Sequence, residues 1–283
     1  MVHAPQRSYT LPCFAGGCGK DIGVQNPRNK ALKISLVTLI VIVAVGAVSW
    51  IADSVIAARA ERSISRAVAD SADLEVEPSV FAGSAMFTSA LISGEFKQVS
   101  INMLDVPVPG VGVVNARTEV QNIEVTAQQA LSGDLDGTRA ELFTRSLSMD
   151  GVALGSHLDM TDLDLSHPID ISPSGGVASE ALLTGTPEGF EEAISVLVAL
   201  RLVGSEFQMV PVELVSAPPS TTLEDVASVF SWRIDTIALP LADRAMAVYL
   251  SGGSIHFQSQ ARNVEITMRE LSPLAAPEAD SAD

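Results

Sequence analysis

The chain has 283 residues, enough for a membrane anchor together with one sizeable domain or two small ones. Apolar residues make up 47% of it, so a large core can be buried, while the formal net charge is −17. Nucleic-acid binding is excluded by this acidity, because phosphate contacts need clustered Lys and Arg.

The first segment, residues 1–33, is a short basic stub that we place in the cytoplasm. It carries five Lys or Arg residues against one Asp, a local charge of +4, which leaves about −21 for the rest of the chain. Both cysteines, Cys13 and Cys18, lie in this stub, so no disulfide framework supports the remainder. The sequence CFAGGC has no second Cys or His pair nearby, and reduced thiols without a metal are the expectation.

Residues 34–52, ISLVTLIVIVAVGAVSWIA, predict a transmembrane helix. These nineteen residues carry no charge and would span roughly 28 Å as a helix. Lys and Arg next to a span stay on the cytoplasmic side, so we expect a single-pass protein of the cell membrane with its main domain outside. A cleaved signal peptide is the alternative, because Ala58-Arg59-Ala60 has the form of a cleavage site. The long basic region and the long apolar run favour the anchor.

The exported part divides into three predicted segments. Residues 53–73 have helical spacing, with Val55, Ala58, Ile64 and Val68 on one stripe, and predict a stalk or first domain helix. Residues 74–272 are mostly strand-like and form the predicted main domain. Residues 273–283 are small and acidic, typical of a disordered tail.

Alternation of apolar and polar residues indicates that this domain is rich in antiparallel strands. It recurs at residues 98–103, 114–121, 162–171 and 264–269, and a hairpin with Gly204-Ser205 at its tip is expected within residues 193–214. Together these segments predict a large antiparallel sheet with one wet face. The segment Val196–Val203 is apolar on both faces, so it must be covered on both sides, by protein or by lipid.

Two short helices are expected after the first one. Thr221 with Glu224 forms a candidate capping box, followed by Leu223, Val226 and Phe230 on one face. Thr186 with Pro187 predicts about one further helical turn.

Catalytic chemistry is scarce in this sequence. No serine lies in a G-x-S-x-G motif, and no phosphate-binding glycine motif is present. The best metal candidate is HLDMTDLDLSHPID, with His157, Asp159, Asp162, Asp164, His167 and Asp170. Strand parity places His167 opposite the aspartates, so an acidic solvent face explains the cluster without a metal. We therefore predict no enzyme, no metal and no cofactor.

The segment LEVEPSVFAGSAMFTSALISGEFKQVSINMLDV, residues 74–106, resembles the signature of the LmeA-type phospholipid-binding family of actinobacterial cell envelopes. A strand ending in Gly, a short Phe/Leu-rich segment, another Gly and a V-x-I strand follow one another there. Later segments at residues 181–186 and from Leu239 also fit, and the similarity spans roughly residues 60–270. One departure is Ser84-Ala85-Met86-Phe87, where the family has an aromatic-Pro-Phe-Leu run.

The resemblance implies an α+β fold in which a large curved antiparallel sheet is packed around one or two helices, similar to tubular lipid-binding proteins. It also implies a phospholipid or related glycolipid held in an apolar groove, and support of lipoglycan synthesis in the envelope. The candidate lining residues are Val80, Phe81, Met86, Phe87, Leu91, Phe96, Val99 and Ile101. Lys97 and Arg117 are candidates for a basic contact with the head group.

Two other functions stay open at this point. The first is a non-enzymatic scaffold or chaperone that stabilises a membrane-bound envelope enzyme, with no lipid in the sheet. The second is a hydrolase that uses the His157–Asp170 cluster.

Overall fold

A computed structural model describes residues 27–83, 87–169 and 177–274. The stub up to residue 26 with both cysteines, Met86, Asp170 and residues 275–283 lie outside the described residues.

The first element is one long helix, α1 (Pro27–Ser71). The chain divides into two compact units, and their boundary falls inside this helix, between Ser49 and Trp50. Among the described residues, α1 alone is long and apolar enough to cross a membrane. By its length and composition α1 can be the predicted transmembrane anchor. A signal sequence near the N-terminus would have the same length and apolar composition.

The second half of α1 belongs to the core of the second unit. Ala60, Ile64 and Val68 are at most 1% exposed, and their spacing of four residues places them on one face. The predicted stripe is therefore right for Ile64 and Val68. It is wrong for Val55, which is 47% exposed.

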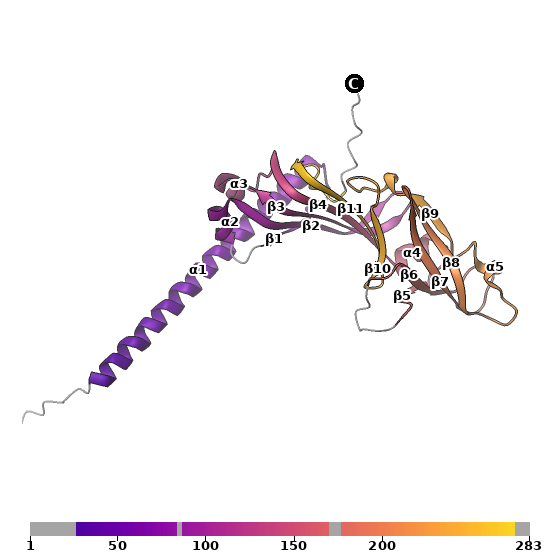
Figure 1. The fold of residues 1–283 in the computed structure, drawn as a ribbon, viewed down its shortest axis with the longest axis horizontal. Helices are drawn as coiled ribbons and strands as arrows, with labels where there is room; N and C mark the ends of the chain where they lie inside the picture. Colours follow the sequence, from indigo (N-terminus) through magenta and orange to yellow (C-terminus); the bar gives the residue numbers. More distant parts are fainter. Residues whose placement is uncertain (1–26, 84–86, 170–176, 275–283) are drawn as a thin grey trace, which may run out of the picture. The chain divides into compact units, whose positions relative to one another are not determined.

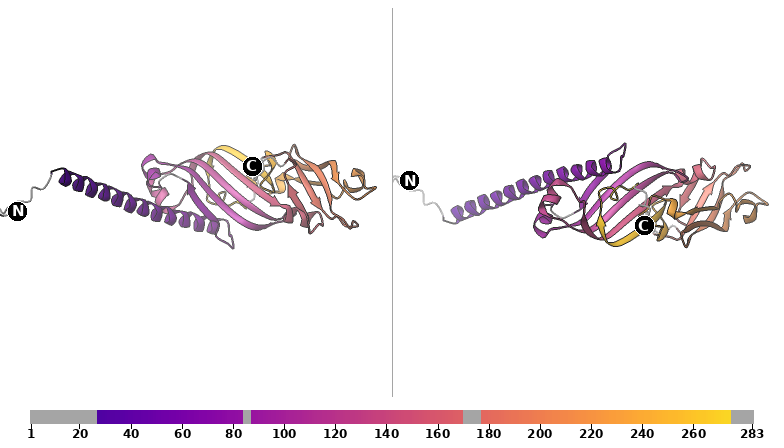
Figure 2. Two further views of the ribbon diagram at one scale, coloured as in Figure 1. Left: turned by 90° about the horizontal axis from the view of Figure 1, so that it is seen from below. Right: turned by 90° about the horizontal axis from the view of Figure 1, so that it is seen from above.

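A six-stranded curved sheet forms the larger half of this unit (Figures 1 and 2). Its strand order is β1-β2-β3-β4-β11-β10, and every pairing is antiparallel. The strands are β1 (Ser79–Gly83), β2 (Glu95–Val108), β3 (Gly112–Glu124), β4 (Thr138–Asp150), β10 (Ala247–Ser251) and β11 (Ser254–Ile266).

A second antiparallel sheet has the order β5-β6-β7-β8-β9. Its strands are β5 (Asp164–Ser166), β6 (Glu180–Gly185), β7 (Ile194–Val203), β8 (Glu206–Ser216) and β9 (Trp232–Asp235). The predicted hairpin is confirmed, since β7 and β8 pair across Gly204-Ser205. The α+β class and the curved antiparallel sheet are also confirmed, although the strands are shared between two sheets.

Register explains why one face of the curved sheet is wet. Val99 pairs with Val120, which pairs in turn with Phe143, and all three side chains are buried on the same face. The alternate residues form polar pairs such as Asn102 with Arg117 on the opposite face. We call the buried side the interior face and the polar side the outer face.

Two apolar clusters fill the unit. The two-sheet core includes Phe207, Trp232 and Phe257, whose rings lie 4.9–6.2 Å apart and come from both sheets. Val196 and Val198 of β7 point into it, while on the other side of that strand Ala199 is buried and Leu197 half-buried. The strand predicted to be apolar on both faces is thus covered in part by protein.

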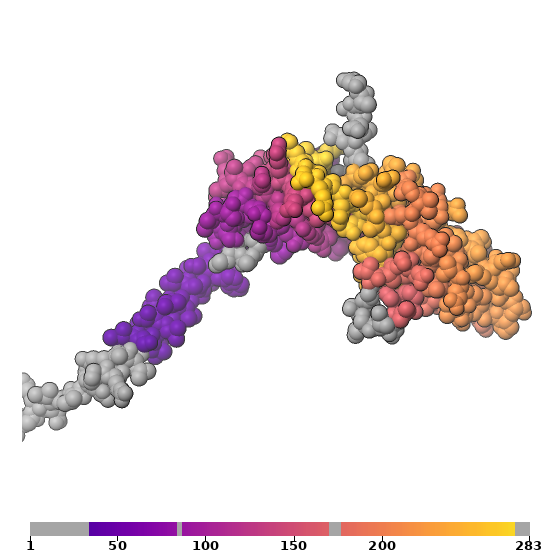
Figure 3. Space-filling model, viewed as in Figure 1, coloured from indigo at the N-terminus to yellow at the C-terminus, as the bar shows by residue number. Residues whose placement is uncertain are grey.

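The second cluster, which we call the helix-side core, lies where α1 packs on the interior face. In the space-filling view this end of the sheet is closed off by surface atoms coloured purple to magenta, so the cluster is enclosed (Figure 3). It joins α1 to β1–β4, to the end of β11 and to two short helices, α2 (Phe87–Ser93) and α3 (Ala127–Ser132). Its buried members are Ala60, Ile64, Val68, Ala82, Phe87, Ala90, Phe96, Val99, Ile101, Val120, Ile123, Val125, Ala130, Leu135, Ala140, Phe143, Ile266, Met268 and Leu271.

The short helices differ most from the sequence prediction. α3, with its capping box of Thr126 and Gln129, and α4 (Gly151–His157) were not expected. The helix α5 (Leu223–Val226) begins one residue later than predicted, because Thr222 donates its N–H and its hydroxyl to Asp225.

The helical turn predicted at Pro187 is wrong. The N–H and hydroxyl of Thr186 instead donate to Asp162, at 2.9 and 2.7 Å, and hold that segment next to β5. A single 3-10 turn, η1 (Thr236–Ala238), completes the described elements.

Candidate functional site

Most of the candidate lining residues come together in the helix-side core. Phe87, Phe96, Val99 and Ile101 are at most 2% exposed, and Val80 and Leu91 are half-buried against the same cluster. They come from three consecutive elements, β1, α2 and β2, and lie within the 22 residues from Val80 to Ile101. The interior face at this end is therefore apolar and formed largely by the residues that the sequence nominated.

Phe87 contacts protein in this structure. Its ring centroid lies 5.4 Å from that of Phe96, in a tilted arrangement, and its side chain is only 2% exposed. Aromatic pairs at such distances add to the stability that burial already provides. Phe87 thus fixes α2 to β2.

Phe81 stands apart from the other nominated residues. It pairs with Ser100 on the outer face, whereas its neighbour Val80 pairs with Ile101 on the interior face. Its side chain is 59% exposed, and its ring lies over Gly83, where an added Cβ would come within 3.1 Å. Strand alternation therefore separates Phe81 from the apolar interior.

Polar side chains of α1 hold the segment that leads into α2. Asp53 accepts hydrogen bonds from the backbone N–H groups of Phe87 (2.9 Å) and Thr88 (2.7 Å), so it caps α2 from another helix. The hydrogen bond from the Thr88 N–H is the largest cause that lowers the pKa of the Asp53 carboxyl. Glu61 accepts from Ala82 N–H at 2.9 Å, and Ser65 donates to the Pro78 carbonyl at 2.7 Å.

α3 is held against α1 by close approach of the two backbones. Ser63 donates its hydroxyl to the carbonyl of Ser132, at the end of α3. Gly133 follows with φ +74°, and an added Cβ there would lie 2.9 Å from the Ile64 nitrogen and 3.0 Å from the Ala60 carbonyl oxygen. A residue without a Cβ is therefore required at this contact.

A band of polar residues crosses the interior face between the two cores. Thr118, Arg145 and Ser259 are register neighbours on β3, β4 and β11, and each is at most 2% exposed. The Arg145 Nη2 donates to the Glu270 carbonyl oxygen at 2.5 Å, and its guanidinium lies 5.5 Å from the Phe143 ring centroid. Burial lowers the pKa of Arg145 to about 10, opposed by the charge of Glu270, so the side chain stays cationic at neutral pH.

Arg145 was not among the residues predicted to line the site. The strand pattern could have placed Arg145 on the interior face, because it has the same parity as Phe143, Leu147 and Met149. The two cations that were nominated, Lys97 and Arg117, both lie on the outer face. Lys97 contacts Glu95 and Arg117 contacts Glu119, each at 2.8 Å.

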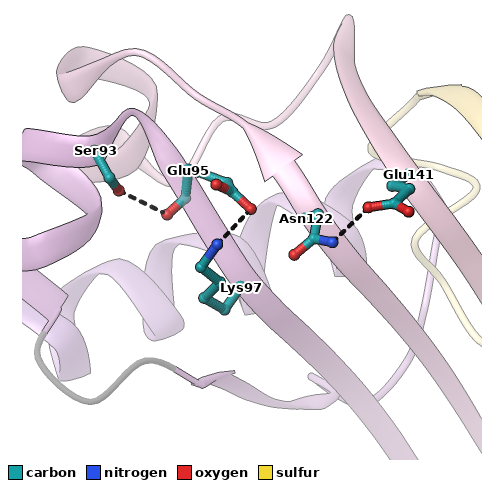
Figure 4. A network of polar contacts seen from close by, with 5 residues as sticks. All are labelled: Ser93, Glu95, Lys97, Asn122 and Glu141. Carbon is teal, nitrogen blue, oxygen red and sulfur yellow. Dashed lines mark hydrogen bonds and ion pairs between the residues drawn. The ribbon is translucent and has the colours of Figure 1, made fainter.

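The outer face carries shallow polar hollows. The larger has a volume of about 920 Å³ and lies where β2, β3, β4 and β11 meet the helix-side end of the sheet. Figure 4 shows part of its lining, where the Asn122 amide donates to Glu141 at 2.6 Å. The lining residue Glu95 also accepts from the neighbouring Lys97 Nζ. Four glutamates and one arginine line the hollow, so it is a poor place for an acyl chain. A second hollow, of about 430 Å³, is lined in part by the stacked rings of Tyr249 and His256.

The histidine and aspartate cluster is dispersed in the structure. His157 packs on Trp232 with ring centroids 4.8 Å apart, and Asp162 holds Thr186. The Nδ1 atom of His167 lies 2.7 Å from the Ile169 carbonyl oxygen. Within residues 27–83, 87–169 and 177–274, no three His, Cys, Asp or Glu side chains are placed to hold a metal.

Comparison with known proteins gives one family. A family model described as LmeA-like phospholipid-binding matches residues 51–260, which cover the second half of α1 and almost all of both sheets. Comparisons with curated proteins and with solved structures give no match.

Proposed function

The chain belongs to the LmeA-like phospholipid-binding family, and on this premise we propose that it holds a phospholipid or related glycolipid against the interior face of its curved sheet. We further propose that residues 34–52 anchor it in the cell membrane with the second unit outside the cytoplasm. There it would support the synthesis of lipoglycans and other envelope lipids.

The observation that carries this proposal is the apolar interior face beside α1. Aliphatic and aromatic side chains from α1, α2 and five strands meet there in one cluster. At its edge, the half-buried Val80 and Leu91 leave apolar surface that an acyl chain can cover. Each CH₂ group moved from water into such surroundings contributes about 0.8 kcal/mol, so a chain of ordinary length binds without specific polar contacts.

Lipid content of the purified full-length chain tests the proposal. Extraction with organic solvent and mass spectrometry should find a phospholipid or glycolipid, and protein stripped of it should take lipid up again from vesicles. Leu91→Arg should lower the amount bound, because it places a charge at the edge of the apolar cluster. Leu104→Arg is the matched control, since Leu104 is 72% exposed on β2 and lies outside that cluster.

Absence of extractable lipid together with absence of uptake would remove this function. A scaffold that stabilises a membrane enzyme would then be the remaining prediction. Equal loss of lipid in Leu91→Arg and Leu104→Arg would contradict the assigned location.

A further inference from the structure

The end of the apolar run of α1 has a defined place in the second unit. Trp50 and Ile51 are 65% and 59% exposed, and they are the last large apolar residues of the run. Trp residues concentrate at the level of lipid head groups, where the ring meets both apolar and wet surroundings. If residues 34–52 span the membrane as proposed, Trp50 marks the level of the outer head groups.

Asp53 connects that level to α2. It is the first charged residue after the run, yet it is only 8% exposed, because its carboxylate accepts the N–H groups of Phe87 and Thr88. Helical rise places Asp53 about 4–5 Å beyond Trp50. The first turn of α2 is therefore held at the head-group level by direct hydrogen bonds.

The outward side of α2 carries one large apolar side chain, that of Ile92, between the exposed Ser89 and Ser93. Phe87 and Ala90 face the helix-side core, while Ile92 is 89% exposed. α2 is seven residues, or about 10 Å, long, so Ile92 cannot lie far from the level of Asp53. Single exposed aliphatic residues are common on protein surfaces, and Val203 at the far hairpin is one of them. Ile92 is distinguished by its helix, because the first turn of α2 is hydrogen-bonded to Asp53, three residues beyond Trp50.

α3 lies further along α1. Its last residues contact α1 at Ala60, Ser63 and Ile64, which are roughly 10–16 Å beyond Asp53 along the helix axis. Leu131 of α3 is 54% exposed, so it offers a similar side chain at a greater distance from the end of the apolar run.

Charge at this end of the sheet does not favour an electrostatic contact. The nearby outer hollow carries Glu95, Glu124, Glu141 and Glu265 against Arg139. Anionic lipid head groups would be repelled by this surface. A contact with the bilayer must therefore come from apolar insertion.

We propose that α2 rests on the outer surface of the bilayer that holds α1, with Ile92 inserted among the lipid head groups. This rests on the proposed anchor and lipid-binding function. It makes the α2 end of the curved sheet the entrance, so that an acyl chain passes from the bilayer to the apolar interior without crossing water.

Site-specific fluorescence on the full-length chain tests this. In a Cys13→Ser, Cys18→Ser background, which has no other cysteine, a polarity-sensitive label is attached to Ile92→Cys, Leu131→Cys or Val203→Cys, one per protein. Each protein is reconstituted in phosphatidylcholine vesicles containing a lipid with a head-group-level spin label. We expect quenching in the order 92, then 131, then 203, and a blue-shifted emission at 92 that iodide does not quench. Equal quenching at 92 and 203 would overturn the proposal.

A second variant separates entry from binding. Ile92→Asp changes an exposed side chain, so it should leave the unfolding temperature unchanged while lowering the rate of lipid uptake from vesicles. The lipid extracted from the purified variant should still match the unmodified protein. If no protein yields lipid, the proposed function fails, while the quenching order still reports whether α2 docks. An unchanged uptake rate in Ile92→Asp would contradict the entrance role.

Discussion

Replacing Phe87 by Ala distinguishes a core residue from a ligand contact. The side chain is 2% exposed and packs on Phe96, so its loss removes apolar burial and leaves a cavity. Phe→Ala at such sites costs about 3–5 kcal/mol of unfolding free energy. We expect the lower part of that range, because α2 is short and can partly close the gap. For a unit of this size a loss of about 3 kcal/mol lowers Tm by roughly 6–12 °C.

The assay is thermal unfolding of lipid-stripped protein, followed by circular dichroism. Phe81→Ala is the matched control, since the same chemical change at a 59% exposed ring should cost at most about 0.5 kcal/mol. Equal Tm values for the two variants would refute the assignment of Phe87 to the core. A normal Tm with weaker lipid uptake in Phe87→Ala would instead make Phe87 a ligand contact.

Two further predictions concern how α1 is held. Gly133→Ala should destabilise the protein by roughly 2 kcal/mol or more, because it combines a positive φ with a clash against the α1 backbone. Gly137→Ala, with φ +69° and open space around it, should show the strain alone when urea unfolding is compared. Asp53→Ala should cost about 1 kcal/mol near neutral pH through loss of the cap on α2. Because the pKa of Asp53 is lowered by folding, its contribution is present above the ordinary value of 3.8 and is lost as the pH falls below it. The difference between the two proteins in pH-dependent unfolding should therefore shrink in acid, and a constant difference would contradict the capping role.

Much of the fold was predictable because strand alternation is visible in one sequence. Val114, Ala116, Thr118 and Val120 were expected on one face, and all are at most 2% exposed. The division into two sheets was not predictable, since pairing partners far apart in the chain leave no local pattern. α3 was missed for another reason: six residues are too few to show a helical period, although Thr126 and Gln129 have the spacing of a capping box.

The candidate site was predictable in part. Period-two spacing placed Val99 and Ile101 inside, and the structure buries both completely. The same spacing cannot say whether Val80 or Phe81 faces inward, because both are apolar. Pairing of Val80 with Ile101 decides it. The polar band at Arg145 could not be predicted without knowing the strand pairing, since Thr118 and Ser259 come from strands distant in sequence.

Photo-cross-linking most directly tests whether phospholipid occupies the interior of the curved sheet. Full-length protein in vesicles is irradiated with a phospholipid that carries a photoactivatable group near the end of one acyl chain, and the modified peptides are identified by mass spectrometry. We predict adducts on α2 and on β2, at Leu91 and within Phe96–Ile101. Adducts confined to the outer face, at Phe81 or Arg117, or no adducts beyond residues 34–52, would contradict the account.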